Sequence, residues 1–182
     1  MTGDLYRRII ESFTVGTGTP YYPGSTCNIF AADVCDACET PLPRTSSGLA
    51  YTCNNILQEL RNNYLSWRKS GTDGKSFVGA QLAANTGRTA VAITYDHIAI
   101  VRPNSTGLPP ESITDVCLAQ AGASPSTNTT LNLCWSADRH NEIEFYIWQG
   151  YLMSNEDAEE YLSNKGAVSY THLRAHETLM NL

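Results

Sequence analysis

The sequence contains no apolar run long enough to cross a membrane and no cluster of basic residues. Its formal net charge is −6 at pH 7, and an acidic chain without a basic patch does not favour nucleic acid as its main partner. The N-terminus does not resemble a signal peptide, because Ile9 and Ile10 stand among charged residues in an amphipathic segment. We therefore expect a single domain over residues 1–167, with no membrane span and no nucleic-acid partner.

Histidine is scarce, and before residue 168 only His97 and His140 occur. Cysteine is plentiful, with six residues in the chain, but its spacing does not predict a metal site. Cys35-x-x-Cys38 lacks the second close Cys or His pair that a zinc site needs, and no suitable strand precedes it as in a thioredoxin-like motif. We expect no metal and no cofactor, and we interpret the cysteines as buried free thiols or as thiols with one disulfide among them.

The C-terminal segment 168–182 does not resemble native protein. From Val168 it reads VSYTHLRAHET, which matches one reading frame of a common transposase library adapter, and the following residues fit the index that comes after that adapter. We therefore expect this segment to be translated sequencing adapter that contributes nothing to the fold, with the native chain interrupted near Ala167. His172 and His176 have a metal-like spacing, but for this reason we predict no metal site from them.

The hydrophobic period changes in the middle of the chain. Helical spacing predicts helices over 4–13, from Ser25 or Thr26 as a cap to just before Pro41, over 51–67, and over 76–85 with Gly87 closing the last. Strands are predicted at 89–94 and 97–102, separated by a hairpin-like break at Tyr95-Asp96, and at 113–119 and 142–148. This order predicts an α+β domain with N-terminal helices packed on an antiparallel sheet.

Two residues combine a reactive side chain with a position suited to catalysis. Cys27 follows a loop rich in Gly, Ser and Thr and opens an apolar helix, where free N–H groups and the helix dipole favour a thiolate and can hold an oxyanion. His97 opens an apolar strand after a tight break, which places its ring at the end of the sheet. This arrangement is typical of papain-like hydrolases, and the alternatives are a packed thiol and a structural histidine.

Four motifs occur in order between about residues 20 and 150. They are CNIFAADV from Cys27, followed by Leu42-Pro43; AANTG from Ala83, followed by Ala90-Val91-Ala92; DHIAIVRP from Asp96; and AQAG from Ala119. Together they resemble the nucleophile helix, the helix and strand before the histidine, the histidine strand and the next strand of CHAP-like and NlpC-type peptidoglycan amidases and endopeptidases. One departure is Asp96, which stands where the family usually has Gly and whose carboxylate is expected to raise the pKa of His97.

The resemblance implies a papain-like (NlpC/CHAP-type) domain with Cys27 as nucleophile and His97 as general base. A third polar group should orient the His97 ring. If the strand of His97 and the next strand pair with Gln120 directly opposite His97, Gln120 can accept from the ring N–H, whereas Asp115 would point to mid-strand. Tyr21 and Tyr22 either line the substrate groove or pack the loop that contains them.

The implied function is hydrolysis of an amide bond in peptidoglycan stem peptides through a thioester intermediate, in the cell wall or periplasm. The partner is then a peptidoglycan peptide, with an immunity protein as well if the enzyme is a toxin. Two alternatives stay open: a catalytically inactive wall-binding module of the same fold, and a cysteine protease or acyltransferase with a protein or lipid substrate. The sequence does not separate them, because specificity resides in loops such as 15–25, 68–76 and 104–112.

Overall fold

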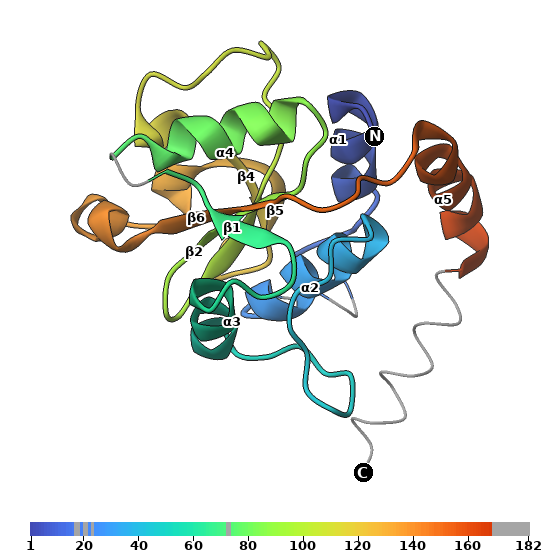
Figure 1. Ribbon diagram of the computed structural model, residues 1–182, viewed down its shortest axis with the longest axis horizontal. Helices are drawn as coiled ribbons and strands as arrows, with labels where there is room; N and C mark the ends of the chain where they lie inside the picture. Colours follow the sequence, from blue (N-terminus) through green and yellow to red (C-terminus); the bar gives the residue numbers. More distant parts are fainter. Residues whose placement is uncertain (17–18, 20–21, 23, 72–73, 169–182) are drawn as a thin grey trace.

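The computed structural model describes residues 1–16, 19, 22, 24–71 and 74–168 (Figure 1). Tyr21 and residues 169–182 of the predicted adapter segment lie outside the described residues. The helices and strands, in chain order, are α1 (Gly3–Glu11), α2 (Cys27–Ala37), α3 (Cys53–Arg61), β1 (Trp67–Lys69), α4 (Ser76–Asn85), β2 (Ala90–Ile93), β3 (Ile98–Val101), η1 (Ile113–Asp115), β4 (Cys117–Gln120), β5 (Ser126–Thr130), η2 (Leu131–Leu133), η3 (Ala137–Glu142), β6 (Glu144–Trp148) and α5 (Asn155–Val168), where η marks a 3-10 helix. None of the helices in this described part has the length and apolar character of a membrane span.

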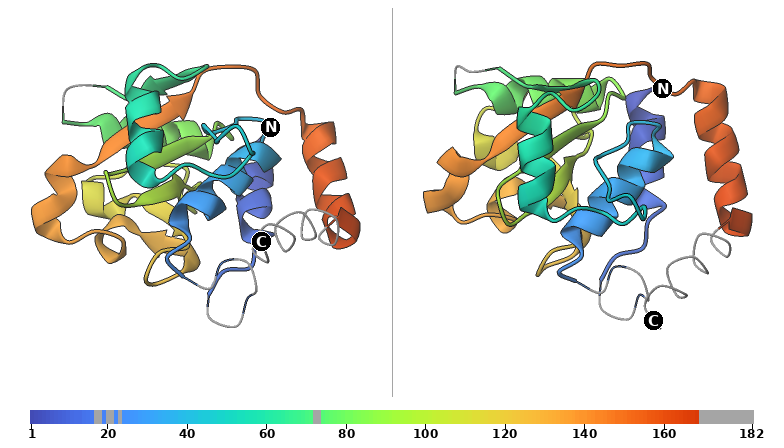
Figure 2. Two further views of the ribbon diagram at one scale, coloured as in Figure 1. Left: turned by 90° about the horizontal axis from the view of Figure 1, so that it is seen from below. Right: turned by 60° about the horizontal axis from the view of Figure 1, so that its bottom comes forward.

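The strands form one antiparallel sheet in the order β1-β6-β2-β3-β4-β5. Every residue of the central strands β2 and β3 is buried, so both faces of the sheet are covered. Helix α4 lies on one face, and α2 and α3 lie on the other (Figures 1 and 2). The predicted α+β class is therefore confirmed, with helices packed on an antiparallel sheet.

Several predicted elements agree with the structure. Helix α4 has the predicted bounds, and Gly87 follows its end with φ 85°, the left-handed backbone that a helix terminus favours in glycine. The predicted hairpin is formed by β2 and β3, in which Ile93 pairs with Ile98 across the Tyr95-Asp96 turn. The alternation of apolar residues, which predicts a strand at 142–148, also agrees with β6.

The predicted helix over 51–67 is wrong in its second half. Helix α3 ends at Arg61, and Asn63 and Leu65 then adopt positive φ angles of 57° and 48°, which no helix continues through. Trp67 becomes the first residue of edge strand β1 and pairs with Trp148 of β6. Its apolar side chain is buried by the sheet, so the helical spacing of the aromatic residues was misleading.

The predicted strand over 113–119 is shorter than expected, and β5 and α5 are among the elements that were not predicted. Residues 113–115 form η1, which Ser112 and Asp115 cap at its N-terminus, and β4 begins only at Cys117. Edge strand β5 and helix α5 were missed. The β5 sequence, STNTT, has no alternation of apolar and polar residues, so a hydrophobic pattern does not reveal it.

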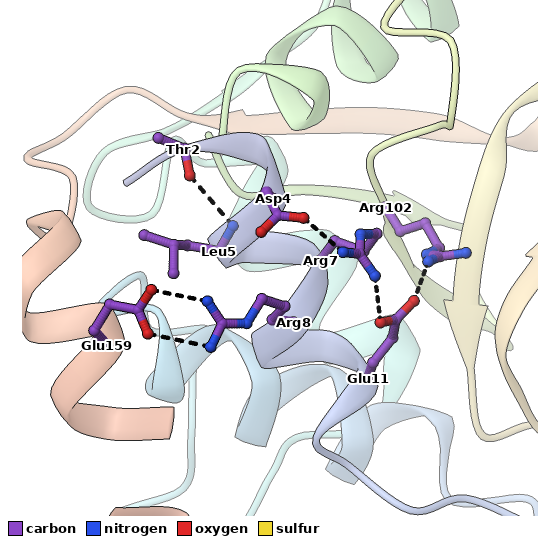
Figure 3. Close-up of polar contacts among 8 residues, drawn as sticks. All are labelled: Thr2, Asp4, Leu5, Arg7, Arg8, Glu11, Arg102 and Glu159. Atoms are coloured by element: carbon purple, nitrogen blue, oxygen red, sulfur yellow. Dashed lines mark hydrogen bonds and ion pairs between the residues drawn. The ribbon is translucent and has the colours of Figure 1, made fainter. Parts of the chain in front are cut away.

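Helix α1 joins α5 to the central sheet through charged side chains (Figure 3). The Arg8 guanidinium donates two hydrogen bonds to the Glu159 carboxylate of α5, at 2.8 and 3.1 Å. Glu11, the last residue of α1, accepts hydrogen bonds from Arg7 and from Arg102, which directly follows β3. These contacts place α1 beside α5 and away from the start of α2, where the candidate site lies.

Candidate active site

Cys27 is the first residue of α2, and backbone hydrogen bonds fix this helix start against the end of β4. The Thr26 N–H donates to the Ala121 carbonyl at 2.9 Å, and the Ser25 N–H donates to the Gly122 carbonyl at 3.3 Å. Ser25 has a left-handed φ of 56°, so the loop turns sharply into the helix. Thr26 is the N-cap residue, but its hydroxyl makes no capping hydrogen bond, and the predicted side-chain cap is therefore wrong.

His97 directly precedes β3, and its ring reaches the sulfur of Cys27. A hydrogen bond from Thr94 N–H to the His97 carbonyl, at 2.8 Å, closes the turn before it. The imidazole lies near the Cys27 thiol, where hydrogen bonding and charge from His97 lower the pKa of that thiol, as does the backbone N–H of Ile98. The two candidate residues, distant in sequence, are thus brought together where α2 meets the end of the β2–β3 hairpin.

A second thiol, not predicted from the sequence, completes this group. Cys53 is the first residue of α3, and its Sγ lies 3.6 Å from the Sγ of Cys27. The Asn28 side-chain amide donates to the Tyr51 carbonyl at 2.9 Å, which ties the start of α2 to the segment that enters α3. A sequence signal for Cys53 did exist, because the triplet Thr-Cys-Asn occurs at residues 26–28 and again at residues 52–54, at the start of each helix.

The surroundings of Cys27 favour its thiolate. A hydrogen bond from Cys53 lowers the pKa of the Cys27 thiol, as do the hydrogen bond and the charge of His97, and these effects outweigh the opposing effect of burial. The pKa of Cys53 is raised in turn, chiefly by its hydrogen bond to Cys27 and then by burial. We interpret the pair as a Cys53 thiol that donates to a Cys27 thiolate.

Trp135 and Gly122 enclose the His97 ring. The indole and imidazole centroids are 4.7 Å apart, with ring planes tilted by 58°. The Trp135 Nε1–H donates to Thr94 Oγ1 at 3.1 Å, which links the indole to the turn before His97. A Cβ atom on Gly122 would lie 2.7 Å from Cε1 of His97, so only glycine leaves room for the ring in this position.

The predicted alignment of Gln120 with His97 is wrong by two residues. Ile100 pairs with Ala119, and Val101 with Leu118, so continuing the register sets Gly122 opposite His97. The Gln120 side chain folds back instead: its Oε1 accepts from the Gly122 N–H at 2.6 Å, and its Nε2 donates to the Ser124 carbonyl. A two-residue shift keeps every side chain on the same face, so the hydrophobic pattern could not distinguish the two registers.

Other polar residues considered for this site have structural partners. The Asp96 carboxylate accepts two hydrogen bonds from Arg139, at 2.7 and 3.0 Å, and one from Thr94, and the hydrogen bond from Arg139 is the main cause of its lowered pKa. Asp115 accepts from the Ser112 N–H at 2.9 Å in the η1 cap. The ring of His140, in η3, hydrogen-bonds to the Trp135 carbonyl at 3.2 Å.

The contacts of Tyr22 favour loop packing over substrate contact, the two roles left open by the sequence. Its ring packs against Phe30 and Phe13, with centroid distances of 5.5 and 6.2 Å, and it is 8% exposed. Its hydroxyl donates to Asp33 at 2.7 Å, and Asp33 also accepts from Arg44. Tyr21, the other residue predicted to line the groove, lies outside the described residues.

The other four cysteines make no sulfur contact with Cys27 or Cys53. All six are free thiols. Cys35 and Cys38 are fully buried on α2 and at its end, and burial raises the pKa of both. Cys117 and Cys134 are half-buried, and burial raises their pKa as well. The described residues contain no group of three or more His, Cys, Asp or Glu side chains placed to hold a metal ion.

A cleft of about 810 Å³ is lined by residues that are close in sequence to Cys53 and His97, but not by Cys27 or His97. Asn54, directly after Cys53, and Tyr95, in the turn before His97, are among its lining residues. Charges of both signs also line it, including Arg61, Lys69 and Glu144. The cleft therefore includes sequence neighbours of Cys53 and His97, and it carries groups that can bind a ligand of mixed charge.

Comparison with protein-family models finds no match for this chain. Comparison with curated protein sequences also finds no match.

Proposed function

We propose that the protein is a papain-like cysteine hydrolase, with Cys27 as the nucleophile and His97 as its general base. One observation carries the proposal: a thiol at the N-terminus of α2 meets an imidazole at the start of β3, in surroundings that lower the pKa of that thiol. A thiolate beside a protonated imidazole is the resting form that thiol hydrolases need, because the thiolate is the attacking species.

In the first half of the reaction, the Cys27 thiolate attacks the carbonyl carbon of an amide bond and forms a tetrahedral oxyanion. Among the described residues, no acceptor takes the backbone N–H groups of Cys27 and Asn28, which are free to donate to that oxygen. His97 gives its proton to the leaving amine as the C–N bond breaks, and the acyl group remains on Cys27 as a thioester.

In the second half, water attacks the thioester carbon while His97 accepts a proton from it. The C–S bond breaks, the Cys27 thiolate leaves, and a carboxylic acid is released. Trp135 and Gly122 contribute by holding the imidazole in one orientation through both halves. Gln120 contributes indirectly, since its side-chain amide fixes the backbone of Gly122.

For the substrate we propose a peptidoglycan stem peptide. The resemblance of the four motifs to CHAP-like and NlpC-type enzymes supports this choice. The mixed charges of the cleft that Asn54 and Tyr95 help to line also support it, because a stem peptide presents free carboxylates and amines along a short chain. Arg61 and Lys69 both bind Glu144, at 2.5 and 3.0 Å, and Glu142 also lines the cleft, so its two positive and two negative side chains balance.

The test is digestion of purified peptidoglycan by the intact chain and by the Cys27→Ser and His97→Ala variants, with mass spectrometry of the released fragments. We expect new amine and carboxyl ends from the intact chain and none above background from either variant. Melting temperatures of the variants serve as the folding control. Equal digestion by Cys27→Ser would overturn the nucleophile, whereas cleavage of proteins but not of peptidoglycan would overturn the substrate.

A further inference from the structure

We infer that Cys27 and Cys53 form a reversible disulfide site, through which a hydroperoxide switches the hydrolase off and a dithiol switches it on again. The effect on hydrolysis rests on the proposed function, but formation of the disulfide does not.

The two thiols are close enough for a disulfide after a small movement. Their Sγ atoms are 3.6 Å apart, whereas a disulfide bond is about 2.0 Å long, so the sulfurs must approach by roughly 1.5 Å. Each cysteine is the first residue of its helix, where the backbone is held by fewer hydrogen bonds than in a helix interior. The bond from Asn28 to the Tyr51 carbonyl keeps the two helix starts adjacent during that movement.

The pair is also chemically distinct from the other cysteines. Cys27 has a favoured thiolate, and Cys53 lies in direct contact with it. Cys35 and Cys38 are fully buried, and their thiols are held in the protonated form by burial. Of the six described cysteines, only Cys27 and Cys53 are in sulfur–sulfur contact. The two residues are 8% and 7% exposed, so each keeps a small accessible surface.

The oxidation balances in two steps. In the first, the Cys27 thiolate attacks one oxygen of hydrogen peroxide; an S–O bond forms, the O–O bond breaks, and the departing hydroxide takes a proton from His97 to become water. In the second, Cys53 loses its proton to His97 and attacks the sulfenic sulfur; an S–S bond forms, the S–O bond breaks, and the departing hydroxide takes that proton from His97 to leave as a second water. Two thiols are oxidised by two electrons, and one peroxide is reduced to two waters.

The order of these steps follows from the charges in the site. While Cys27 is a thiolate, its hydrogen bond and negative charge hold Cys53 in the thiol form. Conversion of Cys27 to a neutral sulfenic acid removes that charge, so Cys53 ionises more easily once its target has formed. A dithiol reverses the reaction by exchange, which restores both thiols as the reductant becomes a disulfide. Cys53 thereby protects Cys27 from further, irreversible oxidation to the sulfinic acid.

The experiment uses hydrogen peroxide as the oxidant and dithiothreitol as the reductant on the full chain. Wild type is compared with Cys53→Ser, which keeps a hydroxyl beside Cys27 but has no sulfur, and with Cys117→Ser, which removes a half-buried cysteine elsewhere. After each treatment, free thiols are blocked, linked and oxidised peptides are identified by mass spectrometry, and peptidoglycan hydrolysis is measured relative to each protein's own untreated rate.

In wild type and Cys117→Ser we expect a peptide linked through Cys27 and Cys53, at least a tenfold loss of hydrolysis, and recovery of most of it with dithiothreitol. In Cys53→Ser we expect Cys27 sulfinic acid and no recovery. Sulfinic acid at Cys27 of wild type without any linked peptide would overturn the proposal, as would full recovery of Cys53→Ser. If Cys53→Ser does not fold, Cys53→Ala takes its place. If neither variant folds, the presence or absence of the linked peptide in wild type decides. A linked peptide in a chain that never hydrolyses peptidoglycan would overturn the proposed function and leave the disulfide site standing.

Discussion

The indole of Trp135 lies against the imidazole of His97, with centroids 4.7 Å apart. The Trp135 Nε1–H also donates to Oγ1 of Thr94, which begins the turn before His97. Trp135 is 3% exposed, so it closes one side of the His97 ring from solvent. The sequence suggested an amide, Gln120, as the group that orients His97. The structure instead surrounds the ring with an indole and the backbone of Gly122.

Replacing Trp135 tests this packing. We expect Trp135→Ala to lower the free energy of unfolding by about 3–5 kcal/mol, because it empties a large buried volume. It should also lower kcat/KM on the order of tenfold or more, since His97 loses its wall. Trp135→Phe keeps a ring and loses the bond to Thr94, at a cost of about 1 kcal/mol. Urea unfolding and peptidoglycan hydrolysis by the folded fraction give the two readouts, and an unchanged kcat/KM in the Ala variant would contradict the orienting role.

The two histidines before residue 168, His97 and His140, should differ sharply in their effect on rate. His97→Ala should lose about as much rate as Cys27→Ser, because the members of a catalytic unit are not additive. His140 contacts the Trp135 carbonyl from η3 rather than the thiol, so His140→Ala should change the rate little. The measurement is kcat/KM of the three variants on one stem-peptide substrate. A larger loss in His140→Ala than in His97→Ala would make His97 a structural residue.

Gly122 gives a test of the space around the imidazole. A Cβ at this position would lie 2.7 Å from Cε1 of His97 and closer still to Oε1 of Gln120, so one or both side chains must move. We expect Gly122→Ala to reduce kcat/KM on the order of ten- to a hundredfold, as changes in supporting residues often do. Gln120→Ala, which leaves His97 its space, should lose less. If both variants hydrolyse peptidoglycan at the wild-type rate, the geometry of the ring is not limiting.

The central part of the fold could be predicted from the sequence because its signals are local. Helix α4 with Gly87, and the β2–β3 hairpin, follow from apolar periodicity and turn residues alone. Trp67 could not be placed, because its burial depends on pairing with Trp148 far along the chain. Strand β5 has no apolar pattern to reveal it, since it is a polar edge strand beside β4.

The candidate site was predicted in part for the same reason. The positions of Cys27 and His97 at element starts could be recognised locally, and the structure brings the two residues together. The Gln120 alignment depended on a register that side-chain patterning cannot fix to within two residues. Cys53 was overlooked although it shares the Thr-Cys-Asn triplet of Cys27, because the triplet does not show that the starts of α2 and α3 are in contact.

The predicted adapter segment can be tested by shortening the chain. The described contacts of α5 with α1 lie before Ala167: Arg8 binds Glu159, Lys165 donates to the Ser12 hydroxyl at 2.7 Å, and Ala158 is fully buried. A chain ending at Ala167 should therefore have the same Tm as the full chain in a thermal melt. A chain ending at Ser154 lacks α5 and should melt at a lower temperature, because the face of α1 that α5 covers becomes exposed. A clear drop in Tm for the longer of the two would contradict the prediction.

The hydrogen bond from Cys53 to Cys27 predicts how the Cys27 thiol titrates. Because the folded-state pKa of Cys27 is lowered, chiefly by this bond, alkylation of Cys27 by iodoacetamide should stay fast well below the ordinary thiol pKa of about 8.5. Cys53→Ala removes the donor, so the midpoint of the rate against pH should move to higher pH. Cys53→Ser supplies a hydroxyl donor and should hold the midpoint near that of wild type.

The same depressed pKa has a consequence for stability with a definite sign. The thiolate of Cys27 contributes stability that is fully present above the ordinary thiol pKa and is lost as pH falls toward the folded-state pKa. The difference in free energy of unfolding between wild type and Cys53→Ala should therefore be larger at about pH 9 than in mild acid.

Alkylation is followed at Cys27 itself by peptide mass mapping, and stability by urea unfolding at each pH. An alkylation midpoint that does not move in Cys53→Ala would show that Cys53 does not support the thiolate, and His97 alone would then account for the reactivity of Cys27.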